Sequence, residues 1–327
     1  MPASPRIAVL GGGGQLGRAL ARAGGHGVIA LRHADADVTD AAALRAAIVA
    51  ARADVVVNAA AWTAVDLAES EPQRCFAVNR DGAGNAASVC SALRIPLIHL
   101  STDYVFDGRK GAPYREDDAR NPLNAYGAAK AAGEDLVLAR HERAVVLRTA
   151  WLFGLEGQNF LRSVLRAALA GRALRVVDDQ RGSPTPAPGL ARIVLAIAQR
   201  MADRASAFGI VHAAGTPDAT WHDIASSAIT AVFPPQMRPA IAAVATEAYP
   251  TQAARPEDSR LDCTRLGATF GLDRPDWARA LPRLAAAIAA DEAERLHAAA
   301  PMESGAKLPA PAPHAAAPGL PRAESGA

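Results

Sequence analysis

The sequence GGGGQLG at residues 11–17 decides the fold, because it stands between an apolar run and an amphipathic one. Residues 7–10 predict a strand, and residues 15–23 predict a helix. Glycines at positions 11, 14 and 17 allow a tight turn and leave the first N–H groups of the helix open to an anion. A strand, a glycine turn and a helix in this order favour dinucleotide binding over a plain tight turn.

Short apolar runs continue to alternate with helical patterns after this turn. Further strands are predicted at residues 28–31, 55–57, 96–100 and 144–147. Helices are predicted at residues 39–50 (capped by Thr39 or Asp40), 72–93 and 123–140. Such alternation is typical of a parallel sheet covered on both faces. We therefore expect an α/β fold, a Rossmann-type doubly wound parallel sheet with a smaller C-terminal substrate-binding lobe.

The second half of the chain is less regular. Its predicted elements are helices at 159–170, 188–201, 262–270 and 276–290, and a strand at 210–213 that could rejoin the sheet. From about residue 298 the chain is rich in alanine and proline and poor in large apolar residues, which predicts disorder. We expect an NAD(P)-binding domain at 1–150, a mainly substrate-binding lobe with some return to the sheet at 151–295, and a disordered tail at 296–327.

Composition excludes several classes of protein. The 327 residues carry a net charge of only +2, without the basic stripe of a nucleic-acid-binding protein. The sequence has no run of 18 apolar residues, so we expect no membrane span. It shows no secretory signal, and its three cysteines have no metal-ligand spacing. These features predict reduced thiols in a cytoplasmic protein.

The residues at two strand ends bear on the choice of cofactor. Arg32 and His33 follow the second predicted strand, where a basic side chain accepts a 2′-phosphate and an acidic one binds a ribose hydroxyl. Arg32 therefore favours NADPH over NADH, unless it is only a solvated surface charge. Ala59, Ala60 and Ala61 close the third strand with small side chains, which would let the cofactor lie against the backbone.

A tyrosine and a lysine stand at helical spacing in the sequence NAYGAAK at 124–130. The i, i+4 spacing places Tyr126 and Lys130 on one helix face, where the ammonium is expected to lower the pKa of the phenol. Tyr126 would then deliver a proton to a carbonyl oxygen as hydride reaches the carbon. A packed tyrosine beside a solvated lysine is the alternative.

The fourth predicted strand ends in a further pair of polar residues. In an open parallel sheet, ligands bind beyond the carboxyl ends of the strands. Thr102 would hydrogen-bond the substrate carbonyl there, unless it is only a capping hydroxyl. Asp103 beside it would contact sugar hydroxyls.

Several ordered motifs extend these features along the chain. They are DVTD at 37–40, VVNAAAWTAVDLAE at 56–69, AVN at 77–79, STDYVFDG at 101–108, LRTAWLFG at 147–154, QNF at 158–160, DDQRGSPT at 178–185 and RPEDSRLD at 255–262. With GGGGQLG and NAYGAAK, they resemble the dTDP-4-dehydrorhamnose reductase family of extended short-chain dehydrogenases, from about residue 6 to about residue 290. STDYVFDG and DQRGSPT together distinguish this family from related sugar-nucleotide epimerases and dehydratases.

The resemblance implies an activity and a site. It implies reduction of the 4-keto group of dTDP-4-dehydro-L-rhamnose to dTDP-L-rhamnose, a step of nucleotide-sugar and cell-surface polysaccharide (lipopolysaccharide) biosynthesis. Tyr126 would donate the proton and Lys130 would hold the nicotinamide ribose. The cofactor would contact Gly11, Gly14, Gln15, Leu16, Gly17, Asp37 and Val38. The sugar would contact Thr102, Asp103 and Trp151, although Trp151 could equally be a core residue.

Three alternatives stay open at this point. Arg255 would face the substrate diphosphate or form a structural salt bridge. The chain would act on dTDP-4-dehydrorhamnose or reduce another deoxysugar nucleotide. It would be an enzyme or a non-catalytic NADP-binding regulatory subunit, which the intact tyrosine and lysine disfavour.

One departure from the family pattern concerns a metal ion. Some members of the family dimerise through magnesium held by carboxylates, one of them from a glutamate just after the proline–threonine pair. Residues 184–189 read Pro-Thr-Pro-Ala-Pro-Gly and hold no carboxylate. We therefore predict no structural metal, and a monomer or weak homodimer.

Overall fold

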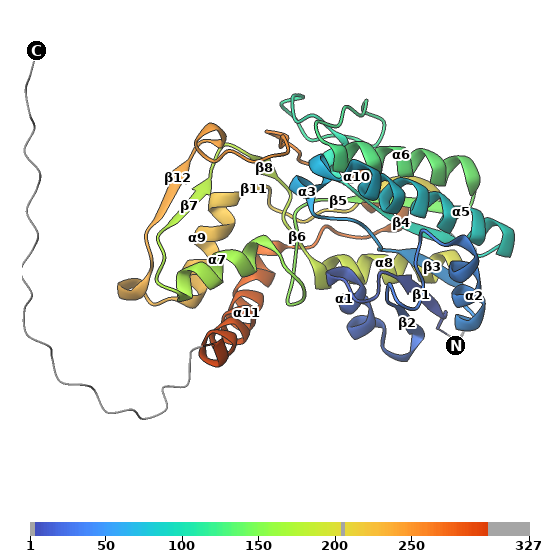
Figure 1. Cartoon of the computed structure of the whole chain (residues 1–327), viewed down its shortest axis with the longest axis horizontal. Coiled ribbons are helices and arrows are strands. Elements are labelled where there is room, and N and C mark those ends of the chain that lie inside the picture. The colour runs from blue at the N-terminus through green and yellow to red at the C-terminus, as the bar shows by residue number, and fades with distance from the viewer. Residues whose placement is uncertain (1–3, 204–206, 300–327) are drawn as a thin grey trace, which may run out of the picture.

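Six parallel strands form one sheet in the order β10-β5-β4-β3-β1-β2 (Figure 1). The structure is a computed structural model that describes residues 4–203 and 207–299. The strands are β1 (Ile7–Leu10), β2 (Val28–Leu31), β3 (Val55–Asn58), β4 (Leu97–Thr102), β5 (Ala144–Thr149) and β10 (Gly209–His212). The predicted α/β fold with a Rossmann-type doubly wound sheet is confirmed, and the strand predicted at 210–213 is found as β10.

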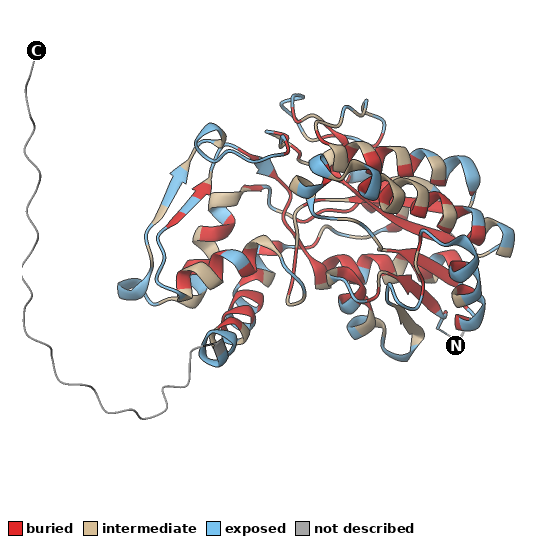
Figure 2. Cartoon of the chain, in the orientation of Figure 1, coloured by how far each residue is buried: buried red, intermediate tan, exposed pale blue. Residues whose placement is uncertain are grey.

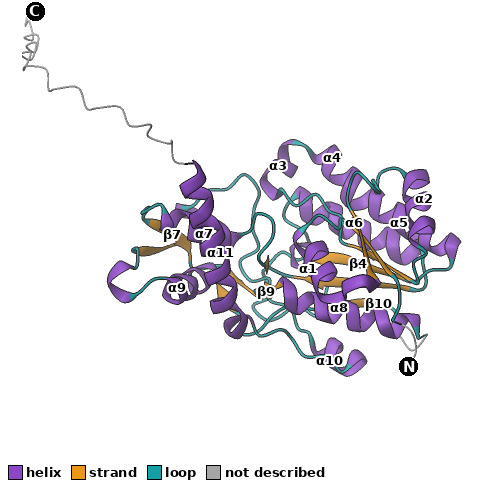
Figure 3. Ribbon diagram, turned by 90° about the horizontal axis from the view of Figure 1, so that it is seen from below, coloured by secondary structure: helices purple, strands orange, loops and turns teal. Residues whose placement is uncertain are grey.

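Helices cover both faces of this sheet because consecutive strand residues point to opposite sides. The helices are α1 (Gln15–Gly24), α2 (Ala41–Ala51), α5 (Gly82–Leu93), α6 (Ala125–Arg140) and α8 (Ala187–Ala202). Val9 packs with side chains of α1 and α8, whereas its neighbours Ala8 and Leu10 pack with α2 and α5. Figure 2 shows the resulting buried centre, and Figure 3 shows the helices on either side of the strands.

The helix predicted at residues 72–93 is interrupted. It consists of α4 (Pro72–Phe76), a π-helical segment η2 (Ala77–Asp81) and α5, after the short helix α3 (Val65–Ser70). The π segment presents the buried Asn79, whose amide accepts a hydrogen bond from the Trp62 N–H and donates one to the Trp62 carbonyl, both at 3.0 Å. The wider turn therefore anchors the loop that follows β3.

A smaller lobe contains three further helices and a pair of parallel strands. These are α7 (Phe160–Leu169), α9 (Trp221–Val232), α11 (Trp277–Ala299), β7 (Leu174–Val177) and β12 (Ile241–Val244). The sequence analysis missed α9 and both strands. Thr220 and Asp223 form a capping box at the start of α9, which was the available local signal.

The remaining elements are short. They are β6 (Leu152–Phe153), β8 (Arg181–Gly182), β9 (Thr185–Pro186), β11 (Ala219–Thr220), α10 (Thr264–Phe270) and the 3₁₀ turns η1 (Gly25–Gly27), η3 (Asp103–Val105), η4 (Pro235–Met237) and η5 (Thr246–Ala248).

The far C-terminus differs from expectation where it is described. Helix α11 continues to Ala299, so the first residues of the tail predicted at 296–327 are helical. Residues 300–327 lie outside the described part of the chain, and the predicted division at residue 150 stays a prediction. Within residues 4–203 and 207–299, no helix is both long enough and apolar enough to cross a membrane.

A buried ion pair fixes α6 against the sheet. Glu134 on α6 is fully buried, and Arg148 on β5 is 1% exposed. The guanidinium donates from Nε and Nη2 to the two carboxylate oxygens at 2.8 and 2.7 Å. Ser101 at the end of β4 donates to the same carboxylate at 2.5 Å. One side chain of α6 is thus bonded to two adjacent strands.

Replacing Arg148 with alanine should destabilise the fold strongly, because Glu134 would stay buried without its main counter-charge. We expect a loss of about 3–5 kcal/mol in the free energy of unfolding, measured by urea denaturation. Arg295→Ala is the matched control, since its side chain is 63% exposed in an ion pair with Asp291. It should change stability by no more than about 1 kcal/mol. Similar losses for both variants would contradict the role assigned to the buried pair.

Candidate active site

Two adjoining cavities lie at the carboxyl ends of the strands. The inner cavity has a volume of about 520 Å³ and is lined by the ends of β4 and β5, by α6 and by the loop after β6. The outer cavity has a volume of about 630 Å³ and is lined by the glycine turn and by the loops that follow β2 and β3. Gly14, Ala59 and Ala61 line both cavities, so one long ligand could occupy the two together.

The glycine turn is held by contacts that exclude larger side chains. Gly11 has φ +75°, and a Cβ there would lie 2.7 Å from the backbone of Ala60. A Cβ at Gly17 would lie 2.5 Å from the Gly11 carbonyl oxygen. Gly11 lines the outer cavity, whereas Gly17 lines neither cavity. Gly17 therefore acts by letting α1 approach the turn.

The start of α1 suits an anion. Gly14 is its N-cap and provides no side-chain hydrogen bond, so the helix begins with N–H groups free of a protein cap. Gln15 is fixed by its amide, which donates to the Leu152 carbonyl at 3.0 Å and accepts from Asn159 at 2.9 Å. Leu16 and Gln15 both line the inner cavity. These residues fit a pyrophosphate between the two cavities.

The outer cavity holds most of the residues predicted for the adenosine half of the cofactor. Asp37, Val38 and Ala60 line it. The Asp37 carboxylate accepts hydrogen bonds from Thr39, and they hold the pKa of that carboxyl below its usual range. Arg32 is exposed and lines neither cavity, although its side chain lies near Gly13 at the rim of the outer one.

Tyr126 and Lys130 both line the inner cavity, as their spacing on α6 predicts. Lys130 is 2% exposed and donates to the Leu100 carbonyl of β4 at 2.5 Å. Burial lowers the pKa of Lys130 to about 8. The expectation that Lys130 lowers the pKa of Tyr126 is wrong for this structure: burial raises the pKa of Tyr126, and only a hydrogen bond with Thr102 acts against it. The phenol therefore keeps its proton at neutral pH.

Thr102 ends β4, Asp103 begins the following turn η3, and both line the inner cavity. The Thr102 hydroxyl donates to Oδ1 of Asp103 at 3.1 Å and accepts from the Tyr104 N–H at 3.2 Å. Ser259 donates to the second oxygen, Oδ2, at 2.6 Å. Burial raises the pKa of Asp103 to about 7. Sequence reasoning missed Ser259, which lies in the RPEDSRLD motif but is 156 residues away from Asp103.

Trp151 forms one wall of the inner cavity in an unusual backbone conformation. Its φ is +45°, and its ring stacks on Trp221 with ring centres 3.6 Å apart and planes 6° apart. Gly182 lies under the ring, where a Cβ would come within 2.2 Å of it. Trp221 opens α9 and was missed because that helix was missed.

Arg255 lies apart from these residues, in a third cavity of about 280 Å³ that also holds Arg175, Trp221 and Tyr249. Its guanidinium forms two hydrogen bonds with Asp66, at 2.9 and 2.8 Å. The salt bridge weighed as an alternative is therefore present. Arg175 is an exposed cation of the same cavity that sequence reasoning did not single out.

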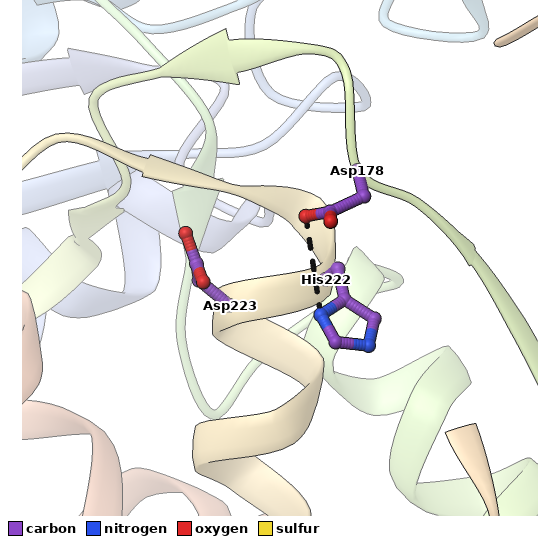
Figure 4. Close-up of side chains that lie close together, drawn as sticks. All are labelled: Asp178, His222 and Asp223. Atoms are coloured by element: carbon purple, nitrogen blue, oxygen red, sulfur yellow. Dashed lines mark ion pairs between the residues drawn. The ribbon is translucent and has the colours of Figure 1, made fainter. Parts of the chain in front are cut away.

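Asp178, His222 and Asp223 group their potential ligand atoms within 4.8 Å in the smaller lobe (Figure 4). The His222 ring nitrogen is 3.9 Å from Asp178. Thr220 donates its hydroxyl to Asp178 and its N–H to Asp223, so both carboxylates also serve the start of α9. The predicted lack of a structural metal stays a prediction.

Comparison with known proteins gives a consistent result. Residues 5–290 match the family described as RmlD substrate binding domain. A dTDP-4-dehydrorhamnose reductase of Sinorhizobium fredii is 39% identical over 86% of this chain and 97% of its own length. A dTDP-4-keto-6-deoxy-D-glucose reductase of Streptomyces niveus is 41% identical over 67% of this chain and 76% of its own length. The crystal structure of a Bacillus anthracis dTDP-4-dehydrorhamnose reductase in complex with NADP is 29% identical, with a TM-score of 0.79, over 86% of this chain and 99% of that one.

Gly17→Ala should lower both the thermal midpoint and the affinity for a dinucleotide, because the new Cβ meets the Gly11 carbonyl. Gly13→Ala is the matched control, since a Cβ there has only Arg32 nearby, at 3.7 Å. The control should keep the wild-type thermal midpoint. Calorimetry and dinucleotide titration of both variants measure the difference. Equal thermal midpoints for the two variants would contradict the close approach at Gly17.

Proposed function

Because the chain belongs to the RmlD substrate binding domain family, we propose that it reduces the 4-keto group of dTDP-4-dehydro-L-rhamnose with NADPH to give dTDP-L-rhamnose. This reaction belongs to nucleotide-sugar and cell-surface polysaccharide biosynthesis. The observation that carries the proposal is that Tyr126, Lys130 and Thr102 line one cavity with the start of α1. A dinucleotide on the glycine turn would thus reach the proton donor.

The residues of the two cavities fit a nicotinamide dinucleotide. The pyrophosphate would lie at the uncapped start of α1, and the adenosine would lie by Asp37, Val38 and Ala60 in the outer cavity. NADPH is the proposed cofactor because Arg32 is free to meet a 2′-phosphate at the rim, and NADH would bind without that contact. When bound, the reduced cofactor supplies the hydride.

Tyr126 would provide the proton that completes the reduction. Its phenol is kept protonated by burial and sits beside Thr102, which would hydrogen-bond the same carbonyl oxygen. Lys130 would hold the nicotinamide ribose with the N–H bonds that it does not give to Leu100. The hydrogen bond to the Leu100 carbonyl keeps this ammonium at the cavity wall.

The substrate would extend from the inner cavity to the third one. Its sugar would lie against Trp151, Thr102 and Asp103 at the end of β4. Arg255 and Arg175 would receive the diphosphate, because guanidinium groups pair well with phosphate oxygens. In this arrangement residues 1–150 supply most of the cofactor site, and residues 151–295 supply much of the substrate site.

We further propose that the chain works in the cytoplasm as a monomer or weak homodimer. Cys75, Cys90 and Cys263 are buried free thiols, as expected in a reducing compartment. Residues 184–189 provide no carboxylate for a bridging magnesium ion.

A second candidate function is reduction of another deoxysugar nucleotide, which the similarity to the dTDP-4-keto-6-deoxy-D-glucose reductase of Streptomyces niveus favours. Product identification separates the two. A non-catalytic NADP-binding subunit is a third reading, and it would bind cofactor without oxidising it in the presence of any 4-keto sugar nucleotide.

The deciding experiment supplies the purified chain with NADPH and dTDP-4-dehydro-L-rhamnose, generated in place by upstream enzymes. We expect NADPH oxidation matched by dTDP-L-rhamnose formation. Tyr126→Phe should lower turnover at least about 100-fold, since the proton donor is lost, while NADPH affinity stays nearly the same. Wild-type turnover of Tyr126→Phe would overturn the proton-donor assignment. Cofactor binding without any turnover by the wild type would contradict the proposed reaction.

Arg32→Ala should weaken NADPH binding about 10- to 100-fold, the effect of losing one charge-assisted hydrogen bond to phosphate. NADH affinity should not change, because NADH has no 2′-phosphate. Fluorescence titration with the two cofactors measures both values in one variant. An equal loss for NADH and NADPH would show that Arg32 acts on the fold and not on the 2′-phosphate.

A further inference from the structure

A chain of hydroxyl and carboxyl groups leads from Tyr126 into the protein. The single hydroxyl proton of Thr102 has two acceptors within reach, the Tyr126 phenol oxygen and Oδ1 of Asp103, which is 3.1 Å from Thr102 Oγ1. Ser259 closes the far end of the chain by donating to Oδ2 at 2.6 Å. Thr102 thus lies between the phenol of Tyr126 and the carboxyl group of Asp103.

Asp103 lies at the end of this chain without a counter-charge. It is 2% exposed. The titratable groups that face it are Tyr104, the next residue, and Tyr126 on α6. The nearby cations are bound elsewhere: Lys130 donates to the Leu100 carbonyl, and Arg255 pairs with Asp66. Among residues 4–203 and 207–299, no cation therefore holds Asp103 in its ionised form.

We propose that Asp103 supplies, through the Thr102 hydroxyl, the proton that restores Tyr126 after each reduction. The inference rests on the proposed function and adds a role for Asp103 beyond contact with the sugar. It also assigns Ser259 as the residue that sets how firmly Asp103 holds its proton.

The proton count balances along the chain. As hydride adds to the carbonyl carbon, the carbonyl oxygen takes the Tyr126 proton and leaves a phenolate. The Thr102 hydroxyl, which donates to Asp103 Oδ1 in the free protein, turns to the phenolate and gives it its proton. Thr102 Oγ1 then takes the proton that the Asp103 carboxyl group carries on Oδ1, 3.1 Å away. Asp103 is left as a carboxylate and regains a proton from water before the next cycle. The net change is the addition of one hydride and one proton to the ketone.

Burial gives Asp103 the property that this role needs. A carboxyl group with an ordinary pKa is ionised at neutral pH and has no proton to give. Desolvation raises the pKa of Asp103 to about 7, whereas the hydrogen bonds from Ser259 and Thr102 act in the opposite direction. Both protonation states are therefore accessible near neutral pH, which is optimal for proton transfer.

Asp103→Asn tests the proposal, because the amide keeps the shape of the side chain and loses the proton. We expect kcat to fall about 10- to 100-fold with NADPH affinity unchanged, whereas KM for the sugar nucleotide reports the separate contact of Asp103 with the sugar. In the wild type, kcat should decline as pH rises through about 7, where Asp103 loses its proton. That decline should be absent in the variant. A rise in KM with the pH profile intact would overturn the proposal in favour of a sugar contact.

Ser259→Ala is a second variant, which should shift the pH dependence of kcat where Asp103→Asn should abolish it. Its hydrogen bond stabilises the ionised form of Asp103, so its removal should raise the pKa of Asp103 further. The decline of kcat should then move to higher pH while the enzyme stays active. A profile that does not move would contradict the assigned pairing with Asp103.

Infrared titration of the free protein adds a readout that does not depend on turnover. We expect a carboxylic acid band that disappears as pH rises through about 7 and is missing in Asp103→Asn. Turnover without this band contradicts the proton supply and leaves the proposed function standing. The band without turnover on the dTDP sugar contradicts the proposed function and leaves the protonation of Asp103 supported.

Discussion

The buried pair of Glu134 and Arg148 is the interaction on which the site depends most. Glu134 follows Lys130 by four residues and Tyr126 by eight, so all three lie on one face of α6. Arg148 and Ser101 hold the Glu134 carboxylate against β5 and β4. The ion pair of Glu134 therefore places both side chains over the strand ends. It lies about one helical turn beyond Lys130 and about two turns beyond Tyr126. A buried ion pair suits this purpose, because losing either partner leaves the other charge buried without its main counter-charge.

The opposite wall of the cavities is fixed by close backbone packing instead of charge. Gly11 and Gly17 let the glycine turn, α1 and the loop after β3 approach within distances that no side chain permits. This packing leaves the uncapped start of α1 facing the ends of β4 and β5. The distance between a bound dinucleotide and Tyr126 is thus set by rigid elements on both sides.

The second half of the chain completes the site from far away in sequence. Trp221 supports the ring of Trp151 by stacking, and Ser259 reaches Asp103 from 156 residues further along the chain. These contacts turn an edge of the sheet into a walled cavity. Burial at this edge raises the pKa values of Asp103 and Tyr126, whereas the hydrogen bond from Ser259 acts in the opposite direction on Asp103.

The sequence by itself determined the parallel sheet, the glycine turn and the common helix face of Tyr126 and Lys130, since each depends on residues within a few positions of one another. The sequence holds no local signal for the π segment at Asn79, for β12 or for the pairing between Asp103 and Ser259. The capping box of α9 was a local signal, but the sequence analysis missed it. It also predicted the wrong direction for the pKa of Tyr126, because spacing reveals a nearby ammonium but not the depth of burial. Only the tertiary structure decides how deeply a side chain is buried and which distant residues meet. Ser259 and Asp103, 156 residues apart in the sequence, are an example. Burial and such contacts both arise when distant segments pack together and exclude water.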